Sequence, residues 1–422
     1  MRRDGAFAKK EINLRIVGLA FCCVVFASCS HASGSSPIPP PLSGGALLTQ
    51  QAQPFLGSGY KSLYSFKGSN AGDGAFPYAG LTALSGTLYG TTALGGGGKG
   101  FGTLFKATTS GKESVVHAFS GTGGDGSEPQ AALADVNGTL YGTTAYGGSG
   151  KACSGGCGTV FKVGAIFLYY NFVGTPDGSA PLGNLIDVKG TFYGTTGAGG
   201  SGTACSSGCG TVFKIVPSKK SFHESVLYSF KGGKDGADPT AGLIALNGTL
   251  YGTTYQGGGA KGYGTVFKIT TSGKESVLYS FKGGKDGTSP SAGLIEVNGL
   301  LYGTASKGGK SLSGVVFTIT TSGKESVLYT FKGGKDGGTP FAVLIDVNGT
   351  LYGTTLKGGG KANEGTVFKI STSGKESVLY GFKGGKDGAQ PWAELLNVNG
   401  TLYGTTTVGG RSGFGTIFRI SP

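Results

Sequence analysis

The sequence predicts a seven-bladed β-propeller, and three observations carry that prediction. One element, Leu/Phe-Tyr-Gly-Thr, returns seven times at intervals of about 50 residues. Each full copy contains four short apolar runs separated by turn residues, as expected for a four-stranded antiparallel blade. The last copy stops after its third run, whereas residues 60–66, a run of the fourth type, precede the first copy. We therefore expect this N-terminal strand to complete the last blade and close the ring.

Composition supports a β-rich domain with many tight turns. The 422 residues include 87 Gly, 25 Phe and 19 Tyr, and only 14% are charged, so we do not expect long amphipathic helices. Such a glycine content can indicate disorder, but here glycine alternates with regularly placed Leu, Ile, Val, Tyr and Phe. These side chains can bury a core, and the sequence therefore predicts an ordered repeat domain over residues 59–422.

The fourth copy illustrates the expected strands. Its four runs cover residues 241–248, 249–255, 264–273 and 274–281. Asn247-Gly248 is a strong two-residue hairpin signal between the first two runs. At strand spacing, we expect the repeated tyrosines and the phenylalanines of the third runs to pack in the core. A linear β-solenoid is the competing architecture, although the polar caps that it requires are not seen at the chain ends.

The repeats also resemble a named family. The recurrent segments "NGTLYGTT", "GTVFKIT" and "SGKESVLYSF" are similar to the GloVer tandem repeat of bacterial exported proteins, over residues 60–422. The resemblance implies an extracytoplasmic, envelope-associated repeat protein, and it implies no catalytic residues. The fifth copy departs from the pattern at Leu300, Ala305, Val315 and Thr318, and we expect that blade to have drifted without losing its fold.

The first 29 residues indicate export. A basic start is followed by an apolar run over residues 16–27 and by Phe-Ala-Ser-Cys, which is similar to a bacterial lipobox with Cys29 as the lipidation site. The alternative is ordinary signal-peptidase cleavage, for example after Ala32. Residues 30–58 then predict a flexible Ser/Pro/Gly-rich tether. The expected location is the bacterial envelope as a lipoprotein, or the periplasm or medium as a secreted protein.

Four further cysteines form two closely spaced pairs in equivalent loops of neighbouring copies. These pairs are Cys153 with Cys157, and Cys205 with Cys209. In an oxidising compartment, two local disulfides are the natural assignment. A zinc site shared between the two loops is the alternative, but CxxxC without a nearby histidine is a weak metal signal.

Propeller geometry places the longer loops on one face. Because strands alternate in direction, the connections from fourth to first strand and from second to third strand share a face, which we call the long-loop face. Every copy carries Asp-Gly-x-x-Pro there. The aspartate can bond its own loop backbone, or the repeated carboxylates can form a ligand-binding ring. The candidate ligand residues on this face are Asp235, Asp286, Asp336, Asp387, Lys234, Lys285, Lys335, Lys386, Tyr255 and Trp392.

These features predict a binding or scaffold protein. The formal net charge is +14, and the loop lysines would attract an anionic partner by a salt-sensitive mechanism. Polysaccharide, an anionic envelope polymer or an envelope protein are the expected partners of a monomer, with membrane contact through a lipid if Cys29 is modified. We do not expect nucleic acid as a partner, nor a cofactor or a metal. The Lys274-Glu275 pair and its equivalents are expected to be self-balancing charges of the short turns.

A carbohydrate-active enzyme is the alternative. Within the predicted repeat domain, residues 59–422, the only histidines are His117 and His223, and no motif orients either of them for catalysis. A hydrolase or lyase would need paired carboxylates. Acids that do not repeat between copies are available for this role, namely Glu128, Asp238, Glu296, Glu364 and Glu394. Nothing in the sequence fixes their separation, so we assign no catalytic residue.

Overall fold

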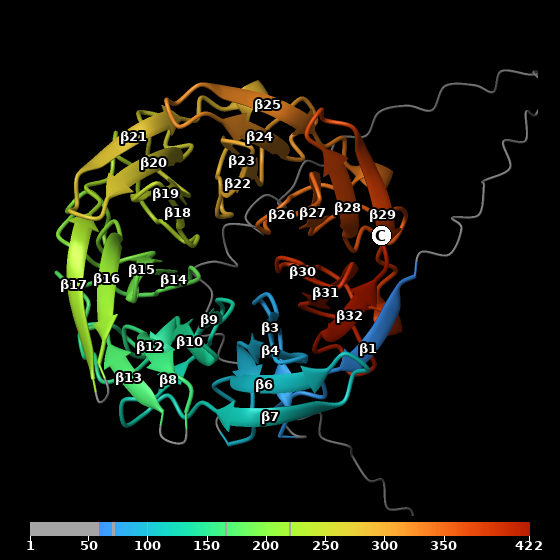
Figure 1. The fold of residues 1–422 in the computed structure, drawn as a ribbon, viewed down its shortest axis with the longest axis horizontal. Coiled ribbons are helices and arrows are strands. Elements are labelled where there is room, and N and C mark those ends of the chain that lie inside the picture. The colour runs from blue at the N-terminus through green and yellow to red at the C-terminus, as the bar shows by residue number, and fades with distance from the viewer. Residues whose placement is uncertain (1–58, 70–71, 99, 165–166, 219–220) are drawn as a thin grey trace, which may run out of the picture. The chain divides into compact units, whose positions relative to one another are not determined.

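The computed structural model describes residues 59–69, 72–98, 100–164, 167–218 and 221–422. These residues belong to one compact unit, Phe55–Pro422, in which β-sheets follow one another around a ring (Figure 1). The predicted signal segment with Cys29 (residues 1–29) and the predicted tether (residues 30–58) lie outside the described residues, so both stay predictions.

Seven four-stranded sheets make up the ring, which confirms the seven-bladed propeller. In sequence order the first four blades contain β3 (Thr82–Leu84), β4 (Thr87–Thr92), β6 (Thr103–Thr108) and β7 (Glu113–Ala118); β9 (Ala134–Val136), β10 (Thr139–Thr144), β12 (Thr159–Lys162) and β13 (Leu168–Asn171); β14 (Ile186–Val188), β15 (Thr191–Thr196), β16 (Thr211–Pro217) and β17 (Phe222–Ser229); and β18 (Ile244–Leu246), β19 (Thr249–Thr254), β20 (Thr265–Thr270) and β21 (Glu275–Ser280). The last three contain β22 (Ile295–Val297), β23 (Leu300–Ala305), β24 (Val315–Ile319) and β25 (Glu325–Thr330); β26 (Ile345–Val347), β27 (Thr350–Thr355), β28 (Thr366–Ser371) and β29 (Glu376–Gly381); and β30 (Leu396–Val398), β31 (Thr401–Thr406), β32 (Thr416–Ile420) and β1 (Lys61–Ser65).

Short elements occupy the loops. Two small two-stranded sheets pair β2 (Gly74–Ala75) with β5 (Leu94–Gly95), and β8 (Gly126–Ser127) with β11 (Tyr146–Gly147). Three single-turn 3₁₀ helices, η2 (Gly284–Asp286), η3 (Gly334–Asp336) and η4 (Gly385–Asp387), carry the lysine and aspartate of three long loops. None of the described segments forms a helix of the length and apolar character that a membrane crossing requires.

Within each blade, strands that are consecutive in the repeat pair antiparallel. In the fourth blade Ile244 pairs with Tyr251, and Gly252 pairs with Phe267. The first strand of each blade lies nearest the centre of the ring and the fourth lies on the outer rim (Figure 1). The chain therefore enters every blade beside the central axis, which makes the residues just before each first strand the natural lining of a channel.

The ring closes through the N-terminal strand, as predicted. β1 pairs antiparallel with β32 in the sheet order β1-β32-β31-β30, with Lys61 opposite Arg419 and Ser65 opposite Thr416. Phe66, which follows β1, is 0% exposed. The last blade thus receives its fourth strand from the other end of the domain, and its third strand is covered.

Neighbouring blades pack through aromatic side chains. Phe230 lies between Tyr228 of its own blade and Phe267 of the next, with ring centroids 5.3 and 5.1 Å away. Phe267 is completely buried and Tyr251 is 6% exposed, so the predicted core role of these repeated aromatics is confirmed. Each blade therefore buries its faces against its neighbours, which is why one repeat alone has no complete core.

The fifth blade keeps this architecture despite its sequence departures. In the other blades a buried threonine pair joins the second and third strands, as Thr254 Oγ1 and Thr265 Oγ1 do at 2.8 Å. In the fifth blade Ala305 pairs with Val315, and both are 0% exposed. Because both hydrogen-bonding partners are replaced together by apolar side chains, neither leaves an unpaired hydroxyl, and the exchange costs little.

The glycine of Leu-Tyr-Gly-Thr is required by close packing. A Cβ atom on Gly252 would lie 2.6 Å from Phe267 Cζ and 2.7 Å from Leu243 Cδ2. Since Phe267 is completely buried, we expect Gly252→Ala to lower the free energy of unfolding by about 1–3 kcal/mol, measured by denaturant titration. Ala245→Ser adds one heavy atom at an exposed position of β18 and serves as the control. Equal stability of the two variants would contradict this reading.

Candidate functional site

The central channel opens on the long-loop face through residues that enter the first strands. Every copy has a five-residue segment that begins with proline and ends with leucine, as in Pro-Trp-Ala-Glu-Leu. Its second and fourth residues vary between copies, and the residue between them is Ala or Gly. Together they line a cavity of about 110 Å³, and a second cavity of about 220 Å³ continues along the inner strands. The first variable position forms what we call the mouth ring, which consists of Tyr78, Gln130, Leu182, Thr240, Ser291, Phe341 and Trp392. The second forms the inner ring, which consists of Gly80, Ala132, Asn184, Gly242, Gly293, Val343 and Glu394.

One side of the mouth ring is aromatic. The ring centroid of Trp392 lies 4.5 Å from that of Phe341 and 5.5 Å from that of Tyr78, the latter pair edge to face. The three side chains come from consecutive blades across the point where the ring closes. Phe341 is 6% exposed and backs Trp392, while Trp392 and Tyr78 keep accessible surface. They form a small aromatic wall, the kind of surface on which a flat apolar ligand face can stack.

Two neighbouring positions of the mouth ring, at the entries to the fourth and fifth blades, carry hydroxyl groups. Thr240 is 8% exposed and Ser291 is half-buried. Within the described part of the chain, neither hydroxyl oxygen has a hydrogen-bond partner. Buried polar atoms are usually satisfied, and unsatisfied ones in a cavity indicate a place for a polar ligand or water.

A single carboxylate lies in the inner ring. Asn184 Nδ2 donates to Glu394 Oε1 at 3.0 Å, and the backbone N–H of Ala132 donates to Asn184 Oδ1 at 2.8 Å. Burial raises the pKa of the Glu394 carboxyl, and the hydrogen bond from Asn184 opposes part of that rise. Gly80 makes room for this side chain, since a Cβ there would lie 2.6 Å from Glu394 Cγ.

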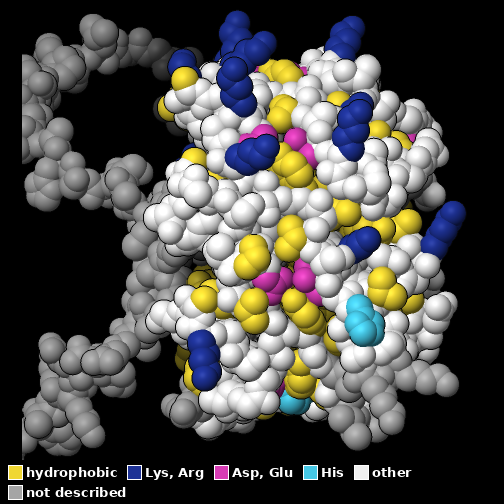
Figure 2. All heavy atoms as spheres, turned by 90° about the vertical axis from the view of Figure 1, so that its left-hand side faces the viewer, with side chains coloured by type: hydrophobic (Ala, Val, Ile, Leu, Met, Phe, Trp, Pro, Cys, Tyr) yellow, Lys and Arg dark blue, Asp and Glu magenta, His cyan; other side chains and the backbone are white. Residues whose placement is uncertain are grey.

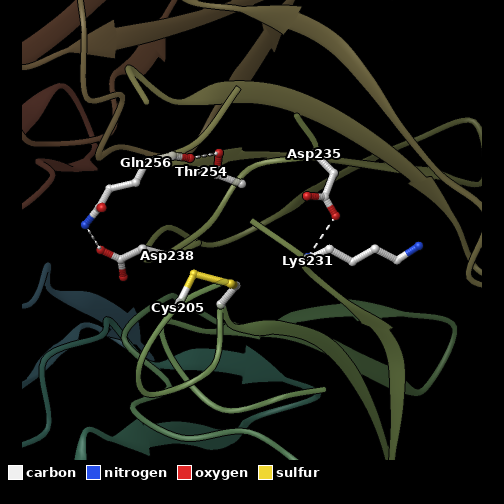
Figure 3. The surroundings of a disulfide bond; sticks show 7 residues. Cys205, Lys231, Asp235, Asp238, Thr254 and Gln256 are labelled. Carbon is white, nitrogen blue, oxygen red and sulfur yellow. Dashed lines mark hydrogen bonds between the residues drawn. A yellow bond between two sulfur atoms is a disulfide. The ribbon is translucent and has the colours of Figure 1, made fainter. Parts of the chain in front are cut away.

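The repeated aspartates of the long loops are bonded within their own loops. Asp235 accepts hydrogen bonds from the Tyr228 hydroxyl and the Lys231 backbone N–H, both at 2.9 Å. Figure 3 shows Asp235 turned toward the Lys231 backbone while the Lys231 side chain extends away. Equivalent tyrosine and backbone bonds engage the remaining candidates, Asp286, Asp336 and Asp387. These carboxylates therefore order the loops, and any ligand must compete with those bonds.

Glutamates of the fourth strands meet the same aspartates, contrary to the expectation that they pair with the adjacent lysines. The Tyr329 hydroxyl lies 2.6 Å from Asp336 Oδ1 and 3.2 Å from Glu376 Oε2, so two carboxyl groups share one phenol between neighbouring blades. Burial, with Asp336 beside it, raises the pKa of Glu376 to about 7. The expectation was wrong because the partner comes from another copy, brought close only by the ring.

The candidate lysines are exposed, but they lie away from the channel. Lys234, Lys285, Lys335 and Lys386 neighbour aspartates that bond outermost-strand tyrosines, and none of these lysines lines the cavity. In a side view of the ring, acidic side chains gather in small groups beside hydrophobic ones, and basic side chains project from the surface (Figure 2). Tyr255 is only 6% exposed, whereas Trp392 lines the mouth.

The other non-repeated acids are dispersed. Asp238 contacts Gln256 at 3.5 Å, and burial raises its pKa to about 6 (Figure 3). Burial raises the pKa of Glu128 to about 7, while Glu296 accepts a hydrogen bond from the Gly299 N–H in its hairpin. Of the five acids named from the sequence, Glu394 lines the channel cavities. No cluster of three or more potential metal-ligating acids, histidines or cysteines occurs within the described ranges.

Both predicted disulfides are present. Cys153 joins Cys157 and Cys205 joins Cys209, with Cα separations of 5.1 and 5.2 Å, so the zinc alternative does not apply. The Cys209 carbonyl accepts a hydrogen bond from the Asp238 N–H, which ties the disulfide loop to the next long loop; Figure 3 shows the disulfide of Cys205 beside Asp238. Disulfides fit an extracellular or secreted protein.

Sequence reasoning named Trp392 and Glu394 but missed the site that they share. Gln130, Thr240, Ser291 and Asn184 were not candidates, because each is an unremarkable residue in its own copy. Aligning the copies on their proline and leucine would have exposed both rings, since those are the positions where the repeats differ.

Fold and site together define the class: a seven-bladed β-propeller whose symmetry is broken at the channel mouth. The profile of the Gloeobacter/Verrucomicrobia repeat matches residues 54–261 and 311–422. The chain therefore belongs to this repeat family, as the resemblance indicated. The unmatched interval includes Leu300 and Ala305 of the divergent fifth copy.

Solved structures share the fold at low sequence identity. An ancestral GH74 enzyme matches with a TM-score of 0.52 and 12% identity, covering 82% of this chain and 48% of the other. The polysaccharide lyase Uly1 matches with a TM-score of 0.46 and 12% identity over 88% and 94% of the two chains. Phage phi92 endosialidase gives a TM-score of 0.43 and 9% identity over 86% and 68%. No curated protein sequence matched. At these identities the similarity concerns the fold alone.

Proposed function

We propose that the protein is a non-catalytic, extracytoplasmic binding propeller whose ligand is a glycan held at the channel mouth. The observation that carries the proposal is the asymmetry of the mouth ring: one arc is an aromatic wall around Trp392, and another carries the hydroxyls of Thr240 and Ser291, which have no hydrogen-bond partner among the described residues. Saccharides offer an apolar ring face and peripheral hydroxyls, so this pairing of surfaces suits them.

Binding is favoured over catalysis because one carboxylate, Glu394, lines the cavity among the described residues. Glycoside hydrolysis ordinarily uses two carboxyl groups on opposite sides of the scissile bond. The exposed lysines lie outside the cavity lining, and we assign them a secondary role that is separate from the ligand at the mouth: a salt-sensitive, long-range attraction of the protein to anionic envelope polymers. Envelope attachment through Cys29 belongs to the same proposal and would keep the propeller close to cell-surface polymers.

A ligand screen tests this function. The purified protein is titrated with neutral and acidic polysaccharides, lipopolysaccharide and DNA, at low and at physiological salt. We expect at least one glycan to bind at physiological salt, and Trp392→Ala to weaken its binding by about tenfold or more.

Two variants control for other surfaces. Val173→Ala removes an exposed apolar side chain outside the mouth and should leave binding unchanged. Replacing Lys234, Lys285, Lys335 and Lys386 with Gln should change only the part of the binding affinity that depends on salt concentration. If the lysine variant abolished binding and Trp392→Ala did not, the channel-mouth proposal would be wrong and a polyanion-binding rim would replace it.

A further inference from the structure

The charge pattern of the cavity distinguishes it from the rest of the surface. The chain carries a formal net charge of +14, yet no Lys or Arg lines either channel cavity within the described residues. Glu394 is the charged residue of the lining, and Tyr78 is its other titratable group. The mouth is therefore an acidic and aromatic pocket on a basic protein, which disfavours an anionic group inside it.

Glu394 is held in place by surrounding groups. The amide oxygen of Asn184 is taken by the Ala132 N–H, so its NH₂ group is the one that faces Glu394. The other six blades have an uncharged residue at the position equivalent to Glu394. Gly80 leaves the space that the Glu394 side chain needs. A carboxylate in such a place loses hydration, and burial raises its pKa; a bound cation would offset that cost.

The remaining groups at the mouth also suit a cation. An ammonium has three donors and no acceptor. Thr240 Oγ1 and Ser291 Oγ are acceptors without a partner in the described part of the chain. The aromatic wall of Trp392, Phe341 and Tyr78 adds ring faces, which attract cations, most strongly at tryptophan. A cavity of about 110 Å³ is smaller than the roughly 150 Å³ that holds benzene, so it admits a ligand's functional group rather than a whole oligosaccharide.

We propose that the channel mouth recognises a protonated primary amine, and that the ligand is an amino sugar with a free amino group. The inference rests on the proposed function and specifies its ligand class. The amine points toward Glu394 with Thr240 and Ser291 as further acceptors, while the sugar lies against Trp392. An N-acetyl group removes the positive charge and adds bulk, so it should be rejected.

Isothermal titration of the full chain with two oligosaccharides of equal length tests the proposal, at a pH where the amine is protonated. One is a glucosamine oligomer and the other its N-acetylglucosamine counterpart. We expect the free-amine oligomer to bind about tenfold more tightly or better. Glu394→Gln should bring the two affinities to within about twofold of each other. Asp346→Asn, which removes an exposed turn carboxylate, should leave the preference unchanged.

The outcomes separate this inference from the function on which it rests. Equal binding of both oligomers to the unaltered protein, or an amine preference that survives Glu394→Gln, would overturn the amine inference. If both bound equally and Trp392→Ala abolished both, the glycan site would stand and only its ligand class would be wrong. If the wider screen found no glycan that depends on Trp392, the proposed function would fail and the amine inference with it. Because the two ligands are compared on the unaltered protein, this test holds even if a variant fails to fold.

Discussion

Removing β1 should abolish the cooperative fold of the propeller. Deletion through Phe66 takes away the strand that pairs with β32. It also removes Phe66, which is completely buried, and nothing fills the space that this side chain occupies in the core. Tyr60, stacked on Tyr380 with centroids 3.9 Å apart, is lost as well. Losing one buried phenylalanine alone typically costs about 3–5 kcal/mol, and the exposed β32 edge invites association between chains.

The matched control is deletion through residue 58, which leaves β1 intact. Light scattering during size-exclusion chromatography and thermal melting should show a monomeric, cooperative domain for the control and aggregates or an early, broad transition for the longer deletion. A synthetic peptide of residues 59–69 should partly restore the transition by adding the missing strand. A monomeric longer deletion with an unchanged melting temperature would contradict the closed ring.

Raising the pH should destabilise the propeller through its rim carboxyl pairs. Burial and the neighbouring Asp177 raise the pKa of Glu224 to about 8, and burial with Asp235 raises that of Glu275 to about 7. Because these folded-state pKa values lie above the ordinary glutamate pKa of about 4.5, the folded state binds protons more tightly than the unfolded state. The stabilisation is present below about pH 4.5 and is lost as the pH rises through 7 to 8.

The size of this effect is moderated by solvent. After discounting for partial exposure, we expect about 1 kcal/mol from each of the pairs of Glu224, Glu275 and Glu376, and a fall in apparent melting temperature of about 5 °C between pH 5 and pH 9. Replacing the three glutamates with Gln should flatten that dependence.

A control with the same change in charge uses exposed carboxylates. Replacing Asp135, Asp187 and Asp346, which each accept a hydrogen bond from a hairpin N–H, with Asn should keep the pH dependence. A melting temperature that rises from pH 5 to pH 9 in the unaltered protein would show that the carboxyl pairs do not control its stability.

The fold was accessible from sequence because its signals are local. Asn247 and Gly248 adopt φ angles of 50° and 76°, the left-handed turn that an Asn-Gly hairpin requires. Counting the apolar runs showed one extra run of the fourth type at residues 60–66 and one missing from the last copy. Pairing the two predicted that the ring closes through the N-terminal strand. Periodicity alone also placed Phe267 and Tyr251 in the core.

The site was less accessible because it depends on contacts between copies. The meeting of Glu376 with Asp336, and of Asn184 with Glu394, joins residues that no local pattern relates. Asp235 and its equivalents were predicted as ligand residues because they recur in every copy on the long-loop face. The structure gives those residues bonds within the loops, and the ligand site that we propose lies instead where the copies differ.

The chain's single tryptophan is Trp392, and its fluorescence tests the central claim most directly. A free-amine glucosamine oligomer added to the full chain at physiological salt should change the emission saturably, with the same dissociation constant as calorimetry gives, and Glu394→Gln should weaken the response. Calorimetric binding of a glycan with no change in tryptophan emission, and with the same affinity in Trp392→Ala, would contradict a ligand site at the channel mouth.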